Sequence, residues 1–126
     1  MRASSEEVLE QLRNTDYIDS ILKDLSYDHF NHTVTLKYGD TSSNENDYIV
    51  LFKDCFSTNF NVWLEGMVTV GGTIEKPGDL GFFFHSIEID DIEINGVKLY
   101  KCSMVIPMMD CQITCVSIEI KLPLLN

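Results

Sequence analysis

Four acidic side chains crowd one short segment in the last third of the sequence: Glu88, Asp90, Asp91 and Glu93. The whole chain shares this bias, because 20 acidic residues against 9 basic ones give a formal net charge of −11 at pH 7. Complementary charge speeds association with a basic protein and disfavours wrong partners. We therefore interpret the segment as part of a docking face for a basic protein. The alternative is an ordinary solvated surface that keeps the protein soluble.

Aromatic side chains would anchor such a docking face if they stood exposed beside it. Trp63 is the single tryptophan of the chain, and Phe82–Phe84 form an aromatic run. A place in the core is the alternative for both. The partner-binding residues predicted from the sequence are Glu88, Asp90, Asp91, Glu93 and Trp63.

The cysteines and histidines do not form a recognisable metal site. Structural zinc takes four ligands, often from tight Cys-x-x-Cys turns, and neither such a turn nor a convincing fourth ligand accompanies Cys102, Cys111 and Cys115. We expect buried thiols, with a Cys102–Cys115 crosslink on oxidation as the alternative. His29 and His32 flank a predicted hairpin tip, where exposed histidines are common. We predict neither a metal nor a cofactor.

The motifs of familiar enzymes are absent from the sequence. It contains no Gly-x-Ser-x-Gly elbow, no phosphate-binding Gly-rich loop and no His-Glu-x-x-His pair. We therefore assign no catalytic residue and predict that the protein is not an enzyme. Two alternatives stay open: a small-ligand-binding β module with the Gly71–Gly81 loop as its mouth, and an enzyme whose site is assembled from dispersed acids.

Charge and hydropathy narrow the class of partner and the cellular location. Binding to nucleic acid depends on clustered cations, which this acidic chain lacks. No stretch approaches the ~20 apolar residues of a membrane-spanning helix. Residues 1–7 place a cation and then acids where a secretory signal has its apolar core. We expect a cytoplasmic protein that binds neither nucleic acid nor membrane; the sequence does not indicate its oligomeric state.

A short amphipathic helix is predicted over residues 5–13. Ser4 and Glu7 fit a capping box, which satisfies backbone N–H groups at the start of a helix. Apolar residues follow at helical spacing on one face. The residues expected to pack this helix against a sheet are Val8, Leu9 and Leu12.

Residues 18–26 fit two kinds of secondary structure. Their apolar side chains recur at the spacing of a helix. Residues 33–38, however, alternate polar and apolar side chains as a half-buried strand does, and such a strand needs a hydrogen-bonded neighbour. A turn at residues 29–32 would supply that neighbour and would place Tyr27 opposite Val34. We therefore favour a strand.

The dipeptide Asn95-Gly96 predicts a hairpin with a two-residue turn. This turn places Glu93 opposite Lys98, an ionic pairing of opposite signs. A four-residue loop over 107–110 then predicts a third strand, with Cys102 opposite Cys115 and Lys98 opposite Glu119. The apolar positions change face across Asp90–Asp91, and we expect a β-bulge there.

These elements predict one domain over residues 1–126, with the helix at 5–13 and mainly antiparallel strands over 18–126. The fold class is α+β, a mostly antiparallel bent β-sheet, either a sandwich or a partial barrel, with one N-terminal helix. The expected core comprises Leu25, Val34, Leu36, Ile49, Leu51, Ile92, Leu99, Cys102, Met104, Ile113, Cys115 and Ile118.

Three segments carry a family resemblance: residues 27–36, residues 52–55 and, above all, residues 87–100. In their hydrophobic spacing and turn chemistry they resemble a largely uncharacterised group of small acidic proteins of Gram-positive bacteria. Similar proteins occur beside polymorphic-toxin genes, which implies an immunity role. The resemblance implies a non-enzymatic, cytoplasmic protein that neutralises a toxin domain by binding it, and it carries no functional residues over to this chain.

Overall fold

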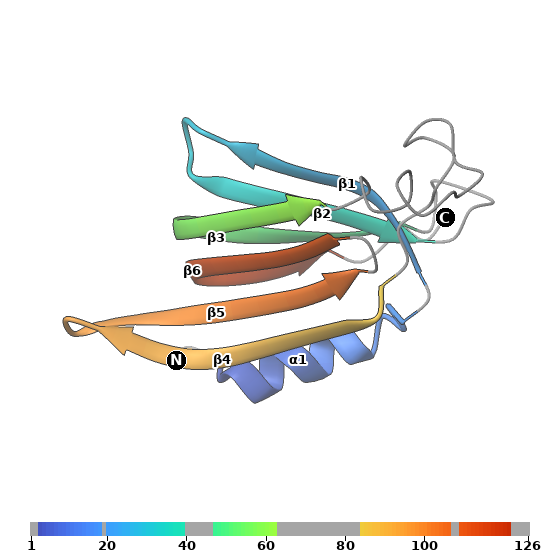
Figure 1. Ribbon diagram of the computed structural model, residues 1–126. Helices are drawn as coiled ribbons and strands as arrows, with labels where there is room; N and C mark the ends of the chain where they lie inside the picture. The colour runs from blue at the N-terminus through green and yellow to red at the C-terminus, as the bar shows by residue number, and fades with distance from the viewer. Residues whose placement is uncertain (1–2, 19, 40–46, 63–83, 107–108, 122–126) are drawn as a thin grey trace.

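The computed structural model describes residues 3–18, 20–39, 47–62, 84–106 and 109–121. These residues form one helix and a single six-stranded antiparallel sheet with the strand order β1-β2-β3-β6-β5-β4 (Figure 1). The elements are α1 (Ser5–Arg13), β1 (Ile21–Asp28), β2 (Thr33–Gly39), β3 (Tyr48–Val62), β4 (Ser86–Ile94), β5 (Val97–Ile106) and β6 (Met109–Lys121). The predicted α+β class, one N-terminal helix with a mostly antiparallel sheet, is confirmed. Trp63 and the Gly71–Gly81 loop lie outside the described residues.

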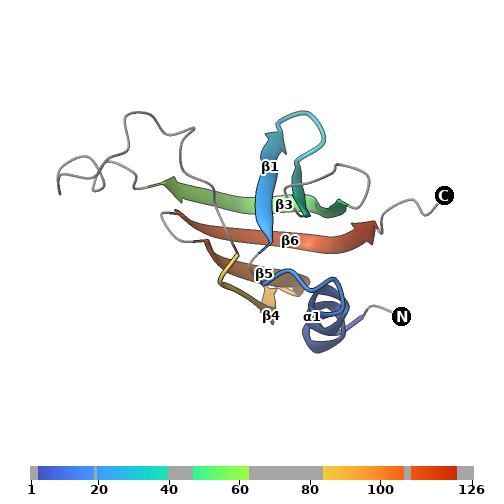
Figure 2. The same ribbon diagram turned by 90° about the vertical axis from the view of Figure 1, so that its right-hand side faces the viewer.

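The sheet is bent and open, and its two edges approach each other at one end. Edge strands β1 and β4 begin close together and then diverge (Figure 1). The backbone N–H of Phe84, just before β4, donates a hydrogen bond of 3.0 Å to the carbonyl of Ser20, just before β1. Figure 2 shows β1 crossing the direction of β3 and β6 at a steep angle. The strands therefore form one coiled sheet and not the two sheets of a sandwich.

Helix α1 begins where the capping box predicts. The Ser4 hydroxyl oxygen accepts a hydrogen bond of 3.2 Å from the backbone N–H of Glu7. Val8 and Leu12 are buried, and Leu9 packs partly buried against the same core. The helix lies along β4 and also contacts β6 (Figures 1 and 2). Within the described residues, no helix has the length and apolar character needed to cross a membrane.

The strand interpretation of the segment after α1 is confirmed from Ile21 onward. Strand β1 pairs with β2 in the predicted register, with Tyr27 opposite Val34 and Leu25 opposite Leu36. The apolar residues of this segment recur at helical spacing although the segment is a strand. A half-buried edge strand can carry apolar residues on both of its faces, so this spacing does not distinguish it from a helix.

The β4–β5 hairpin has the predicted turn and register. Asn95 has a φ of 50° and Gly96 a φ of 84°, and positive φ at both central residues is the requirement of a type I′ turn. Glu93 lies opposite Lys98, as predicted.

The predicted bulge at Asp90–Asp91 is wrong. The β4–β5 ladder continues through these residues without a register shift. Ile87 and Ile89 are buried on one face, whereas Ile92 and Ile94 fall on the other face and are half-buried and exposed. The apparent change of face therefore reflects incomplete burial near the hairpin tip and not an extra residue.

The predicted register between β5 and β6 is wrong by two residues. Only residues 107–108 connect Ile106, the end of β5, to Met109, the start of β6. Cys102 therefore lies opposite Ile113 and not Cys115. Because side chains alternate with a period of two, a two-residue shift leaves each of them on its predicted face.

The predicted pairing of Lys98 with Glu119 is wrong as well. The β5–β6 ladder runs only as far as the pair Tyr100 and Cys115. Glu119 instead forms an ion pair with Lys53 of β3, with 2.5 Å between Nζ and Oε2. Both partners of this pair are partly exposed.

The core agrees in part with the prediction. Seven of the expected residues are buried: Val34, Leu36, Leu99, Cys102, Met104, Ile113 and Cys115. The other five are half-buried: Leu25, Ile49, Leu51, Ile92 and Ile118. Of the two positions considered for Phe84, docking anchor or core, the core position is confirmed, because Phe84 is 1% exposed. Its ring contacts Tyr38 and Tyr17 beyond the end of α1, with centroids 5.1 and 6.2 Å apart. The Thr15 and Tyr38 hydroxyls share a hydrogen bond of 2.6 Å, which ties the end of the helix to β2.

Candidate functional site

Strand β4 distributes its four acids over both of its faces. Successive side chains of a strand point to opposite sides. Glu88 and Asp90 therefore lie on one face, and Asp91 and Glu93 lie on the other, toward α1. All four side chains are exposed. Because β4 is an edge strand, both pairs are accessible from the open edge of the sheet.

Asp91 connects this strand to the start of the helix. Its Oδ2 accepts a hydrogen bond of 2.9 Å from the backbone N–H of Ser5. A carboxylate at a helix N-terminus also interacts favourably with the helix dipole, an effect of about 0.3–1 kcal/mol. The Tyr100 hydroxyl donates a second hydrogen bond to the carbonyl of Ala3. These two contacts fix the N-terminal end of α1 against β4 and β5.

The helix adds its own carboxylates to the same side of the molecule. Its outer face carries three exposed acids, of which Glu10 pairs with Arg13 at 3.6 Å. We use the name acidic surface for the group formed by Glu6, Glu7, Glu10, Asp91 and Glu93. Residues separated by about 80 positions meet here, so the local charge pattern used for the sequence prediction did not reveal the contribution of the helix.

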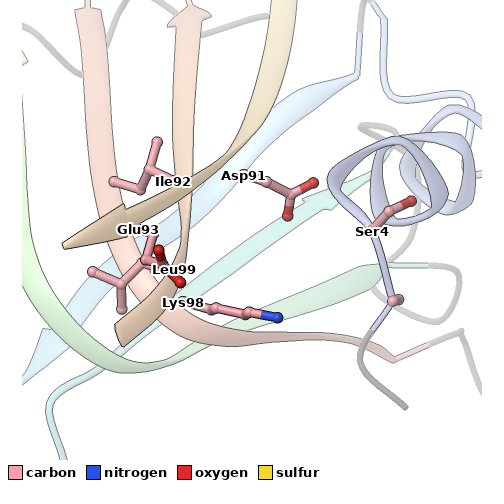
Figure 3. Close-up of a pocket in the computed structure, with 7 residues that line it drawn as sticks. Ser4, Asp91, Ile92, Glu93, Lys98 and Leu99 are labelled. Atoms are coloured by element: carbon pink, nitrogen blue, oxygen red, sulfur yellow. The ribbon is translucent and has the colours of Figure 1, made fainter. Parts of the chain in front are cut away.

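A pocket of about 510 Å³ opens in the acidic surface between the start of α1 and the β4–β5 hairpin. Its lining residues are Ala3, Ser4, Asp91, Ile92, Glu93, Lys98 and Leu99. Figure 3 shows Asp91 and Lys98 extending from neighbouring strands toward the end of the helix at Ser4. The rim carries both signs of charge, and apolar side chains form the larger part of the exposed lining. Such a pocket fits a partner side chain that has an apolar stem and a charged end.

The described residues bear on the small-ligand alternative only at Tyr100. A deep apolar pocket lined by Trp63 or Tyr100 would have favoured it. Tyr100 is only 3% exposed and is engaged by the carbonyl of Ala3, so it does not line the pocket beside α1. Trp63 and the Gly71–Gly81 loop lie outside the described residues.

The cysteines are free and buried. Burial raises the pKa of Cys111 to about 12 and that of Cys102 well above its ordinary value. These thiols are therefore protonated at neutral pH, whereas metal ligation and thiol exchange both require thiolates. In the part of the chain that the structure describes, no group of three or more His, Cys, Asp or Glu residues could hold a metal ion.

A second charged cluster, near the start of β1, is centred on a buried carboxylate and stabilises the fold. Asp47 is 7% exposed, and its Oδ1 and Oδ2 lie 2.7 and 3.8 Å from the Nζ atoms of Lys23 and Lys37 respectively. The β1–β2 register shifts at Lys23, and such irregularities redirect a side chain. Gly39 packs directly against Asp47, where a Cβ atom would collide with the carboxylate. The cluster joins β1, β2 and the start of β3.

The comparison with known families identifies the class of this protein. The sequence matches the family model of immunity protein PIM7 over residues 4–122. The chain therefore belongs to this immunity protein family, which implies toxin neutralisation and a cognate toxin as partner. Immunity proteins are typically non-enzymatic, in agreement with the prediction that this chain is not an enzyme. A search among curated proteins gave no match.

Proposed function

We propose that this protein neutralises its cognate toxin by covering a basic region of that toxin with the acidic surface. The observation that carries the proposal is the docking of α1 on β4, which places the pocket lined by Asp91 and Glu93 next to a second hollow lined by the three acids of α1. Ser4 lines both. The net charge of −11 adds a long-range attraction for a basic protein. In this proposal the protein acts in the cytoplasm.

The pocket suggests how the two proteins would align. A lysine or arginine side chain of the toxin entering it would meet the carboxylates of Asp91 and Glu93, while Lys98 on the rim would repel a misplaced cation. Paired charges of this kind fix the register of an interface and suppress wrong partners. A partner that approaches along the open β4 edge would also meet Glu88 and Asp90.

The experiment measures association of the full chain with toxin domains encoded beside its gene, by surface plasmon resonance at several salt concentrations. We expect Glu93→Lys to slow association by about tenfold at low salt, with a smaller difference at high salt, because salt screens exposed charges. Glu93 is preferred to Asp91 for this test because Asp91 also caps the helix.

The matched control is Asp24→Lys, which makes the same change of charge on β1, at the other edge of the sheet, where Asp24 is also exposed. Its association rate should stay close to that of the original chain. If both variants slow association equally, net charge alone explains the change in association rate. That result would overturn the assignment to the acidic surface. Absence of any bound toxin would overturn the proposal as a whole.

A further inference from the structure

The turn between β1 and β2 presents the most exposed large apolar side chain of the described residues. Phe30, at the tip of this turn, is 90% exposed. Phe56 of β3 is 64% exposed and follows directly after Cys55, whose backbone N–H donates a hydrogen bond of 2.8 Å to the carbonyl of His32 in the turn. Two exposed phenylalanines therefore belong to one connected part of the structure.

The turn is held in a fixed shape by its own polar groups. The Asp28 carboxylate accepts hydrogen bonds from the backbone N–H of Phe30 at 2.9 Å, and from the backbone and side-chain nitrogens of Asn31 at 3.2 and 2.9 Å. Tyr27 Oη lies 2.8 Å from Nδ1 of His32, and the His29 ring stands edge-on to Tyr27 with centroids 4.7 Å apart. Phe30 is thus presented from an ordered support, which lowers the entropy lost on binding.

The backbone at this junction is strained. His32 has a φ of 52° and Asp54 a φ of 56°, both in the left-handed region that favours glycine. This conformation costs roughly 1 kcal/mol for each residue with a Cβ atom. His32 is the acceptor of the hydrogen bond from Cys55, and Asp54 directly precedes the donor in the chain. Strain of this kind concentrates where a structure holds a functional shape.

We propose that this turn is a second contact with the same toxin, in which Phe30, supported by Phe56, enters an apolar pocket with a basic rim. The inference rests on the function proposed above. Exposed carboxylates of Asp28 and Asp54 accompany the two rings, and the adjacent Lys53 is already paired with Glu119. The matching rim on the partner is therefore positive, as it is for the acidic surface. Rigid aromatic anchors are typical hot spots of protein interfaces.

The placement of the turn supports a single partner. The β1–β2 turn, the β4–β5 turn and the N-terminal end of α1 all lie toward the same side of the molecule in Figure 1. The diverging edges of the sheet separate them. A toxin domain seated on that side would contact the acidic surface and the aromatic turn together.

The test uses the full chain and the toxin domain that it binds. We expect Phe30→Ala to weaken affinity at least about tenfold, mainly through faster dissociation, and to do so at high salt as well as at low salt. Because Phe30 is almost fully exposed, the Phe30→Ala variant should keep the circular dichroism spectrum and the Tm of the original chain. The matched control is Ile18→Ala, which removes a side chain that is 58% exposed near the other end of β1.

The possible outcomes separate the two proposals. If the original chain binds the toxin and Phe30→Ala binds equally well, or no worse than Ile18→Ala, the aromatic contact is overturned while the acidic surface stands. If sedimentation shows that Phe30→Ala abolishes self-association and leaves toxin binding unchanged, the partner of the turn is a second copy, and the inference is again overturned. If the original chain binds no toxin, the proposed function itself fails.

A second variant tests whether the shape of the turn matters. Asp28→Ala keeps Phe30 but removes the three hydrogen bonds that order the turn. We expect a loss of affinity smaller than that of Phe30→Ala. Binding unchanged from the original chain would contradict the role of the ordered support.

Discussion

At the β4 edge of the sheet, a helix lies along the strand and Asp91 caps its N-terminus. The hairpin there closes through an Asn-Gly turn, in which glycine takes one of the two positive φ angles. At the β1 edge, the described residues contain no covering helix. A buried carboxylate there holds two lysines, and the hairpin closes through a turn without glycine that exposes Phe30. The β4 edge follows short sequence motifs that can be recognised in the sequence. The β1 edge depends on contacts between charged residues that are distant in the sequence. The comparison suggests that the second edge gives up local stability to hold a particular shape.

The largest effect on this comparison should come from Asp47→Asn. The change removes the charge that Lys23 and Lys37 share, and breaking a buried ion pair on one side costs about 3 kcal/mol or more. Because both lysines are partly exposed and can regain water, we expect a loss of about 2 kcal/mol in the free energy of unfolding, measured by urea denaturation. The control is Glu119→Gln, which breaks the exposed pair with Lys53 and should cost much less, because water screens this pair. Equal losses would show that the buried cluster does not secure the β1 edge.

A smaller effect is expected from Gly96→Ala in the turn of the β4 edge. A Cβ atom at Gly96 would meet nothing within 4 Å, so the cost comes from the backbone φ of 84° alone. We expect a loss of about 1 kcal/mol in the free energy of unfolding, measured in the same way. Asn95→Gly, which relieves the neighbouring positive φ of 50°, should be neutral or slightly stabilising. An unchanged stability of Gly96→Ala would mean that the turn relaxes to another type.

The smallest effect concerns the pH dependence of the β1–β2 turn. Hydrogen bonds from the backbone N–H of Phe30, then from the side chain and backbone of Asn31, lower the pKa of Asp28 below its ordinary value. A carboxyl with a lowered pKa in the folded state stabilises the fold above its unfolded pKa, and this contribution is lost as the pH falls through the folded pKa. The Tm advantage of the original chain over Asp28→Ala should therefore shrink as the pH falls below about 4. NMR titration of the Asp28 carboxyl should show a pKa below the ordinary aspartate value of 3.8.

The fold could be predicted where a short motif determines geometry. Asn95-Gly96 set the β4–β5 register, and the capping box of Ser4 and Glu7 set the start of α1. Residues 107–110 contain no comparable turn signal, so the sequence did not determine the length of that loop. The predicted β5–β6 register was therefore wrong by two residues. The side chains of both strands still lie on their predicted faces, because side chains alternate along a strand with a period of two.

The candidate site could be predicted only in part, because it depends on contacts between distant segments. Local crowding identified Asp91 and Glu93, but nothing in the sequence places Ser5 next to Asp91, 86 positions away. The same holds for the burial of Asp47 between two lysines. The exposure of Phe30 also escaped the sequence, since a phenylalanine beside a turn is as compatible with the core as with the surface.

The open sheet has a consequence for how this protein behaves at high concentration. Unpaired backbone groups along β1 and β4 offer a template on which another molecule could add a strand and begin a fibre. Asp24 and Asp28 stand exposed along the first of these strands, and Glu88 and Asp90 along the second. If two copies met edge to edge, the carboxylates of one copy would lie beside those of the other and would repel them. The carboxylates that attract a foreign protein thereby also keep the molecule from polymerising with itself.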